Sequence, residues 1–96
     1  MPFIQVVEYE TDRPDEVRKL GEQWMREIPA EGPTRATLAE DRDKPGHFVM
    51  VAEFPSYEQA MAHSKLPQTS KYAEKMQKLA RGKPRFVNLE ATQQEM

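Results

Sequence analysis

The sequence contains no cysteine, which excludes a disulfide framework, a thiol nucleophile and a cysteine-based zinc site. It has no apolar run approaching the ~18 residues that span a bilayer, and its first residues lack the features of a secretory signal. Its 14 Lys and Arg residues are balanced by 16 Asp and Glu residues, so it lacks the basic excess of a nucleic-acid or membrane-surface binder. We therefore expect a cytoplasmic protein with no nucleic-acid or membrane partner.

Large apolar residues are also scarce. Leu, Ile, Val and Phe make up 17 of the 96 residues, which is below the ~20% at which disorder is suspected. The net charge of only -2 is too small for a disordered chain, so we expect a folded protein with a thin core that dimerisation completes. At this length we expect one domain over residues 1–91, followed by a frayed tail over residues 92–96.

The first third of the chain predicts a strand followed by a helix. Residues 3–10 (FIQVVEYE) are rich in β-branched and aromatic types, which favours a strand. Thr11 and Asp12 offer N-cap oxygens for the helix, which Pro29 is expected to end. The apolar stripe of this helix consists of Val17, Leu20, Trp24 and Ile28.

The rest of the chain predicts a hairpin, two helical segments and a last strand. Ser56 and Gln59 match a capping box at the start of the first helical segment. Pro67 ends that segment, and the second one is expected to restart at Thr69 or Ser70. The predicted segments are 34–41 and 47–54 for the hairpin strands, 56–65 and 69–81 for the helices and 85–91 for the last strand.

This order is β-α-β-β-α-β. It predicts an α+β, ferredoxin-like fold in which a four-stranded antiparallel sheet carries its helices on one face. The other face of the sheet would be bare and apolar, which is more than a monomer usually exposes. We therefore expect a homodimer whose sheets pack face to face.

The element order and the segment from Val51 to His63 (VAEFPSYEQAMAH) resemble the dimeric α+β barrel superfamily. That group includes antibiotic-biosynthesis-monooxygenase-like proteins, quinol monooxygenases, heme-degrading monooxygenases and many small proteins of unassigned function, actinobacterial ones among them. The resemblance covers almost the whole chain. It is specific for the fold, but the fold hosts unrelated chemistries.

The resemblance implies a small cofactor-independent monooxygenase-like enzyme that binds an aromatic or polyketide-like molecule between the sheet and the helices. Cofactor-independent members place an amide on the first strand, where this chain has Gln5. His63 lies in the element that lines the family's pocket and is a candidate general base, and Tyr72 is a candidate hydrogen-bond donor. The implied ligand-binding walls are Phe3, Trp24, Met50 and Phe54.

The heme-degrading branch differs from this sequence at two places. It carries Trp where this chain has Phe54, and it needs a His ligand where this chain has residues 72–76, which contain no His. We therefore expect no heme, no metal and no other cofactor.

The sequence leaves simpler interpretations open. His63 could be a surface residue of a short helix, Trp24 and Tyr72 could be core residues, and the burial of Glu53 is undecided. The protein could then be a non-catalytic small-ligand-binding or accessory dimer, or a structural dimer without a site. A closed pocket with converging polar groups would favour the enzyme or the binder, whereas a filled core would favour the structural dimer.

Overall fold

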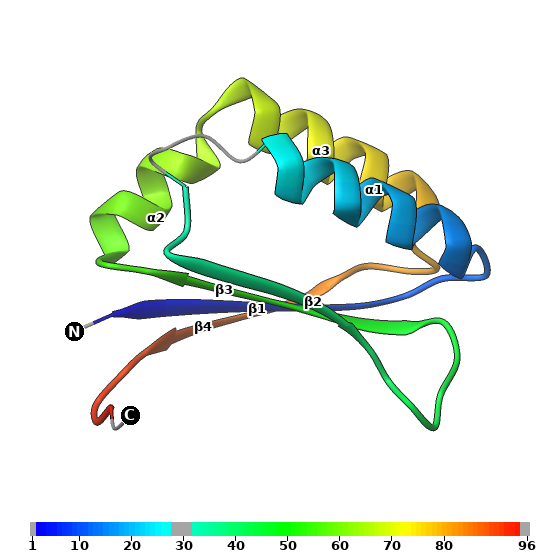
Figure 1. Ribbon diagram of the computed structural model, residues 1–96, viewed down its shortest axis with the longest axis horizontal. Coiled ribbons are helices and arrows are strands. Elements are labelled where there is room, and N and C mark those ends of the chain that lie inside the picture. The colour runs from blue at the N-terminus through cyan, green and yellow to red at the C-terminus, as the bar shows by residue number, and fades with distance from the viewer. Residues whose placement is uncertain (1, 28–31, 95–96) are drawn as a thin grey trace.

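The computed structural model describes residues 2–27 and 32–94 of the chain. Within this part, four strands and three helices follow one another in the order β1-α1-β2-β3-α2-α3-β4 (Figure 1). Their bounds are Phe3–Glu10 for β1, Pro14–Glu27 for α1, Arg35–Glu40 for β2, His47–Phe54 for β3, Tyr57–Ser64 for α2, Pro67–Leu79 for α3 and Arg85–Glu90 for β4.

The strands form one antiparallel sheet in the order β2-β3-β1-β4. All three helices lie on the same side of this sheet, and its other side carries no helix (Figure 1). The predicted α+β ferredoxin-like fold is therefore confirmed. Because β1 and β3 occupy the centre, the side chains that face the helices from these two strands set the floor of any site between the two layers.

Helix α1 packs through the predicted stripe, in which Val17 is fully buried. The predicted stripe position Ile28 and the predicted stop Pro29 lie outside the described residues. The N-cap prediction for Thr11 is wrong in detail, because the Thr11 hydroxyl accepts a hydrogen bond from the N–H of Arg13, which precedes the helix. The same hydroxyl donates to the carbonyl of Leu79 at 2.6 Å, so Thr11 joins the end of β1 to the end of α3.

The second helical region is split as expected, but α3 begins earlier than predicted. It starts at Pro67 rather than at Thr69 or Ser70, because the first turn of a helix needs no N–H from its first residue and tolerates proline there. Helix α2 begins as predicted, since the side chain of Ser56 accepts a hydrogen bond from the N–H of Gln59.

The buried apolar residues form two clusters rather than one continuous core. One cluster contains Phe3, Ala52, Phe54 and Ala60, and the other contains Tyr9, Val17, Phe48 and Met76. This division agrees with the scarcity of large aliphatic residues, because few side chains are available to fill the middle of the interface between sheet and helices.

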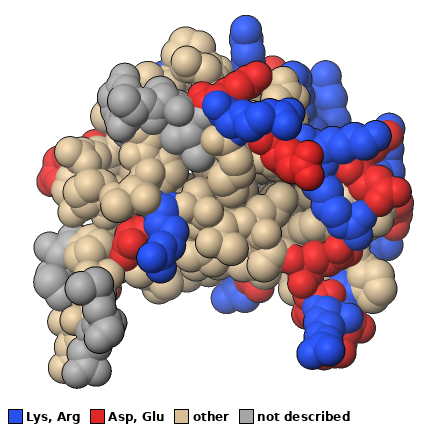
Figure 2. Space-filling model, viewed as in Figure 1, with Lys and Arg blue, Asp and Glu red and all other residues tan. Residues whose placement is uncertain are grey.

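On the face of the molecule seen in Figure 2, acidic and basic side chains are intermixed rather than separated by sign. At the end of the chain, Gln94 donates a hydrogen bond of 2.7 Å to the half-buried Glu53, and the rest of the predicted tail, residues 95–96, lies outside the described residues. In the part of the chain that the structure describes, no helix has the length and apolar character needed to cross a membrane.

Candidate functional site

A cavity of about 140 Å³ lies between the sheet and the helices. Its lining includes Phe54 and Ala52 from one core cluster and Tyr9 and Met76 from the other, so it occupies the gap between them. Its enclosed volume is close to the ~150 Å³ of a cavity that binds benzene. The cavity therefore has room for one aromatic ring.

The floor of the cavity follows from strand alternation. Every second residue of β1 faces the helices, which brings Gln5, Val7 and Tyr9 into the lining. Pairing between strands then places Ala52 beside Gln5 on β3 and Phe86 beside Val7 on β4. Phe86 is 60% exposed and lies where the edge of the sheet opens to solvent, so it forms the mouth of the cavity.

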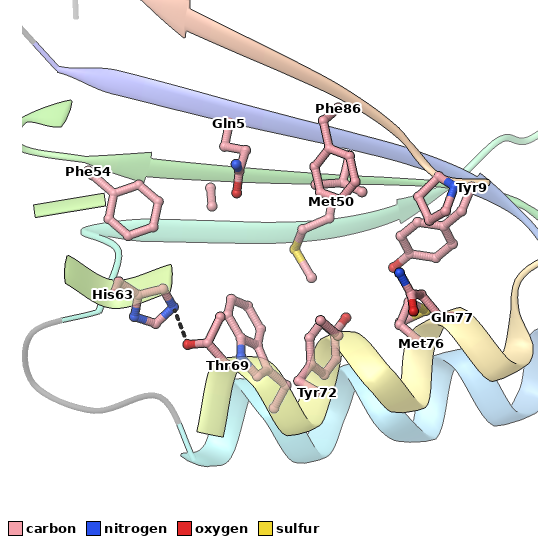
Figure 3. A pocket seen from close by; sticks show the side chains of 15 residues that line it. Gln5, Tyr9, Met50, Phe54, His63, Thr69, Tyr72, Met76, Gln77 and Phe86 are labelled. Atoms are coloured by element: carbon pink, nitrogen blue, oxygen red, sulfur yellow. Dashed lines mark hydrogen bonds between the residues drawn. The ribbon is translucent and has the colours of Figure 1, made fainter. Parts of the chain in front are cut away.

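The amide of Gln5 is held in place by its neighbour on β4. Its Nε2 donates a hydrogen bond of 3.3 Å to Oδ1 of Asn88, and Figure 3 shows the side chain turned toward the cavity from the sheet. The predicted amide of the first strand therefore lines the cavity with its oxygen available as an acceptor.

Three helices form the roof, and their aromatic rings contact one another. The rings of Trp24 from α1 and Tyr72 from α3 stack with a centroid distance of 5.0 Å. Trp24 also meets the ring of His63 from α2 edge-on at 6.2 Å. This arrangement leaves little freedom for the three side chains, so they form a preorganised wall.

His63 supplies the imidazole of this wall, a type of side chain suited to proton transfer. It is only 5% exposed, and its ring also lies 5.4 Å from that of Phe54. Its Nε2 shares a hydrogen bond of 3.3 Å with the hydroxyl of Thr69, which fixes the orientation of the ring (Figure 3). The interpretation of His63 as a surface residue is therefore wrong.

Two tyrosine hydroxyls lie at the other end of the cavity. Burial raises the pKa of the Tyr9 phenol, and burial together with the nearby Tyr9 raises the pKa of Tyr72. Both phenols therefore stay neutral and act as hydrogen-bond donors or acceptors rather than as bases. Tyr9 was missed in the sequence, where it reads as one more apolar residue of the first strand.

The structure brings six of the seven predicted site residues together. The exception is Phe3, which does not belong to the described lining of the cavity but packs into the core and against Tyr57, with ring centroids 5.3 Å apart. Phe3 therefore does not line this cavity, although its partner on β3, Phe54, does. The six predicted residues that line the cavity are Gln5, Trp24, Met50, Phe54, His63 and Tyr72.

The described lining contains no Asp, Glu, Lys or Arg. The second histidine, His47, does not belong to the described lining of the cavity. Strand alternation places it on the opposite side of the sheet, where its Nδ1 lies 3.6 Å from a carboxylate oxygen of Asp41. Among the described residues, no group of three or more His, Asp or Glu side chains is arranged to hold a metal ion. The cavity thus offers an apolar volume with neutral polar groups and one imidazole.

No protein-family model matches the chain, and no curated protein is similar enough in sequence to match it. Several solved structures share its fold. A protein from Mycobacterium tuberculosis superposes with a TM-score of 0.87 at 18% identity, over 100% of both chains. An antibiotic biosynthesis monooxygenase gives 0.82 at 19% identity, over 97% of this chain and 100% of that chain.

The cofactor-independent oxygenase SnoaB from Streptomyces nogalater also matches, with a TM-score of 0.81 at 18% identity over 97% of this chain and 95% of that one. The protein therefore has the fold of the antibiotic-biosynthesis-monooxygenase-like structures, as the sequence resemblance predicted. At such low identities the likeness establishes the fold and leaves the activity to be argued from the cavity.

Proposed function

We propose that the protein is a small cofactor-independent monooxygenase-like enzyme that acts on a single-ring aromatic molecule in this cavity. The observation that carries the proposal is the buried imidazole of His63, which Thr69 orients at the wall of an apolar cavity of about 140 Å³. A fused polyketide exceeds this volume, so any further ring would extend through the mouth beside Phe86.

The chemistry requires a base, donors for the developing oxyanion and an oxidant. His63 takes a proton from an activated C–H or O–H group of the ring. The Tyr72 hydroxyl stabilises the negative oxygen that results. A phenol presents a ring CH2 group in its keto tautomer. With dioxygen as the oxidant, this CH2 group becomes C=O, and the second oxygen atom leaves as water together with the two hydrogens. Gln5 orients the ring through its amide.

A second candidate is a non-catalytic binder that uses the same cavity. The packing of His63 favours it. The imidazole lies against the rings of Trp24 and Phe54 at centroid distances of 6.2 and 5.4 Å, so it forms part of the cavity wall whether or not it transfers a proton. The two candidates share a ligand class and differ in turnover.

The test is oxygen consumption with hydroquinones, catechols and other single-ring phenols. His63→Gln keeps the size of the side chain but removes the base, and we expect kcat/KM to fall at least ~10-fold, since general base catalysis contributes about 10²–10⁴. His47→Gln, on the other side of the sheet, is the matched control and should retain full activity. Binding without oxygen consumption in the wild type would favour the binder, and equal rates for His63→Gln and wild type would contradict the enzyme.

We also propose that the protein works as a homodimer joined through the helix-free face of the sheet. The alternation of the strands places Val6, Val49 and Val87 on this face, and Val51 and Leu89 there are 37% and 44% exposed. A second copy supplies the same apolar rows, which are bordered by charges of both signs, such as the ion pair between Arg85 and Glu8. A two-fold axis would bring such borders together as complementary pairs.

A further inference from the structure

The hydroxyls of Tyr9 and Tyr72 lie buried in the cavity, close enough to interact with each other. Both oxygens are shielded from solvent, and neither has a partner of normal geometry among the described residues. A contact between two hydroxyls uses only one of their two hydrogens, so at least one donor of the pair is left without an acceptor. A buried donor without an acceptor destabilises the fold, so this pair in a thin core requires an explanation.

The surroundings of the pair define what could satisfy it. Tyr9 is 5% exposed, and its ring stacks on Phe48 with a centroid distance of 6.2 Å, so the strand holds it firmly. Tyr72 is held from the other side by its stack on Trp24. In Figure 3 the two hydroxyls project into the same part of the cavity, at the end away from His63. Two fixed donors that meet in an apolar space match a single acceptor oxygen.

The charge of the ligand follows from the rest of the lining. The described lining has no Lys or Arg to pair with an anion, and burying an unpaired carboxylate or phosphate is far more costly than burying a carbonyl. The volume of about 140 Å³ limits the ligand to one ring with a small substituent.

We infer that the hydroxyls of Tyr9 and Tyr72 together bind one acceptor oxygen of an uncharged, single-ring ligand. This inference deepens the proposed function and rests on its use of the cavity as a ligand site. It adds Tyr9 as a residue that determines specificity, and it sets the orientation of the ligand. The oxygen points to the tyrosine pair, and the opposite edge of the ring faces His63 and Thr69.

The test compares three probes of similar shape: acetophenone, which has an acceptor oxygen, α-methylstyrene, which replaces that oxygen by a CH2 group, and benzoate, which is anionic. Their affinities are measured by calorimetry for the wild type, Tyr9→Phe, Tyr72→Phe and Tyr57→Phe. Tyr57 is the matched control, because it is 50% exposed and does not belong to the described lining.

We expect the wild type to bind acetophenone about 10-fold more tightly than α-methylstyrene and to bind benzoate more weakly than either, since two neutral hydrogen bonds suffice for such a ratio. Tyr9→Phe and Tyr72→Phe should each lower the affinity for acetophenone several-fold relative to the affinity for α-methylstyrene. Neither substitution should weaken the binding of α-methylstyrene. Tyr57→Phe should leave the ratio unchanged. The melting temperature of Tyr9→Phe should be equal to or above that of the wild type, because the lost hydroxyl makes no hydrogen bond of normal geometry among the described residues.

Equal affinities for acetophenone and α-methylstyrene in the wild type, or a ratio that Tyr9→Phe leaves unchanged, would overturn this inference while leaving the proposed ligand site intact. A clear drop in the melting temperature of Tyr9→Phe would show that the hydroxyl is structural and would also overturn it. Failure of the wild type to bind either uncharged probe would overturn the inference together with the proposed function.

Discussion

Single residues decide which chemistry the cavity supports. His63 shows which features of a residue can be predicted from the sequence and which cannot. The resemblance placed it in the element that lines the family's pocket, but the spacing of apolar residues in that helix could not show whether the imidazole is buried. Its burial depends on Trp24 and Phe54, which come from other parts of the chain. Tyr9 could not be predicted for the same reason, because its hydroxyl meets Tyr72 only through the packing of α3 on β1.

Gly46 yields a prediction at the residue scale. It has a positive φ of 86°, and a Cβ atom there would overlap the backbone carbonyl oxygen of Thr11. The two residues are held together because the carbonyl of Gly46 accepts a hydrogen bond of 2.8 Å from the N–H of Thr11. Gly82 also has a positive φ, of 80°, but a Cβ atom there meets nothing within 4 Å. Substitution by alanine therefore carries the same conformational cost at both glycines. Only at Gly46 does it also carry a steric cost.

We expect Gly82→Ala to lower the free energy of unfolding by about 1–2 kcal/mol, the cost of a left-handed conformation. Gly46→Ala should lower it by at least about 1 kcal/mol more, since the backbone on both sides must move. Urea unfolding of the two variants and the wild type measures the difference. Equal effects of the two substitutions would contradict the close approach of the β2–β3 turn to Thr11.

At the scale of elements, the sequence predicted most of the strands and helices because their signals are local. The alternation of β1, the apolar run of β3 and the capping box of α2 each depend on neighbouring residues. The early start of α3 at Pro67 was missed, because proline is read as a helix breaker unless it is recognised as the first residue of a new helix. The contact of Thr11 with Leu79 joins distant segments and has no local signal.

Glu40 links three elements and predicts a pH effect. Its carboxylate accepts a hydrogen bond of 2.7 Å from Arg18 of α1 and one of 3.0 Å from the N–H of Gly46 in the turn. The Arg18 guanidinium first, and the Gly46 N–H second, hold the pKa of this carboxyl below its ordinary value of 4.5. A carboxyl with a lowered pKa stabilises the folded state above the unfolded pKa, and that contribution is lost as the pH falls through the folded pKa.

Glu40→Gln should therefore be less stable than the wild type at pH 7, and the difference should shrink as the pH falls below about 4.5. Urea unfolding at a series of pH values measures it. Glu16→Gln is the control, because Glu16 pairs with Arg13 on the exposed surface at the start of α1 and such pairs contribute little. A difference in the free energy of unfolding between Glu40→Gln and the wild type that stays constant or widens toward low pH would contradict the stabilising role of the Glu40 carboxylate.

At the scale of the whole molecule, the thin core explains both the cavity and the bare face of the sheet. The composition predicted that few large side chains would be available for the core. It did not predict that the unfilled space would lie between the two core clusters. The position of the cavity depends on which side chains the packing of three helices on four strands brings together. The volume of about 140 Å³ agrees with the single-ring ligand that we propose.

The proposed homodimer is tested by sedimentation. Obligate interfaces of this type bury upwards of ~2,000 Å², so we expect the wild type to sediment at twice the chain mass of 11.2 kDa at micromolar concentration. Val51→Lys places a charge on the helix-free face and should shift the protein to monomer, because an unpaired buried charge is costly. Gln68→Lys, on the exposed surface of α3, should not. A wild type that sediments as a monomer would contradict the dimer.

The central claim is that the cavity between sheet and helices binds a small uncharged aromatic molecule, and an NMR titration of the backbone amides tests it most directly. With acetophenone as the probe, we expect shifts in the wild type at the residues that line the cavity. Ala52→Leu fills the cavity from β3 and should remain folded in its own spectrum but lose binding at least ~10-fold, whereas Ala39→Leu on the edge strand β2 should bind as the wild type does. Shifts confined to other surfaces, no shifts in the wild type, or unchanged affinity in a folded Ala52→Leu would contradict the account.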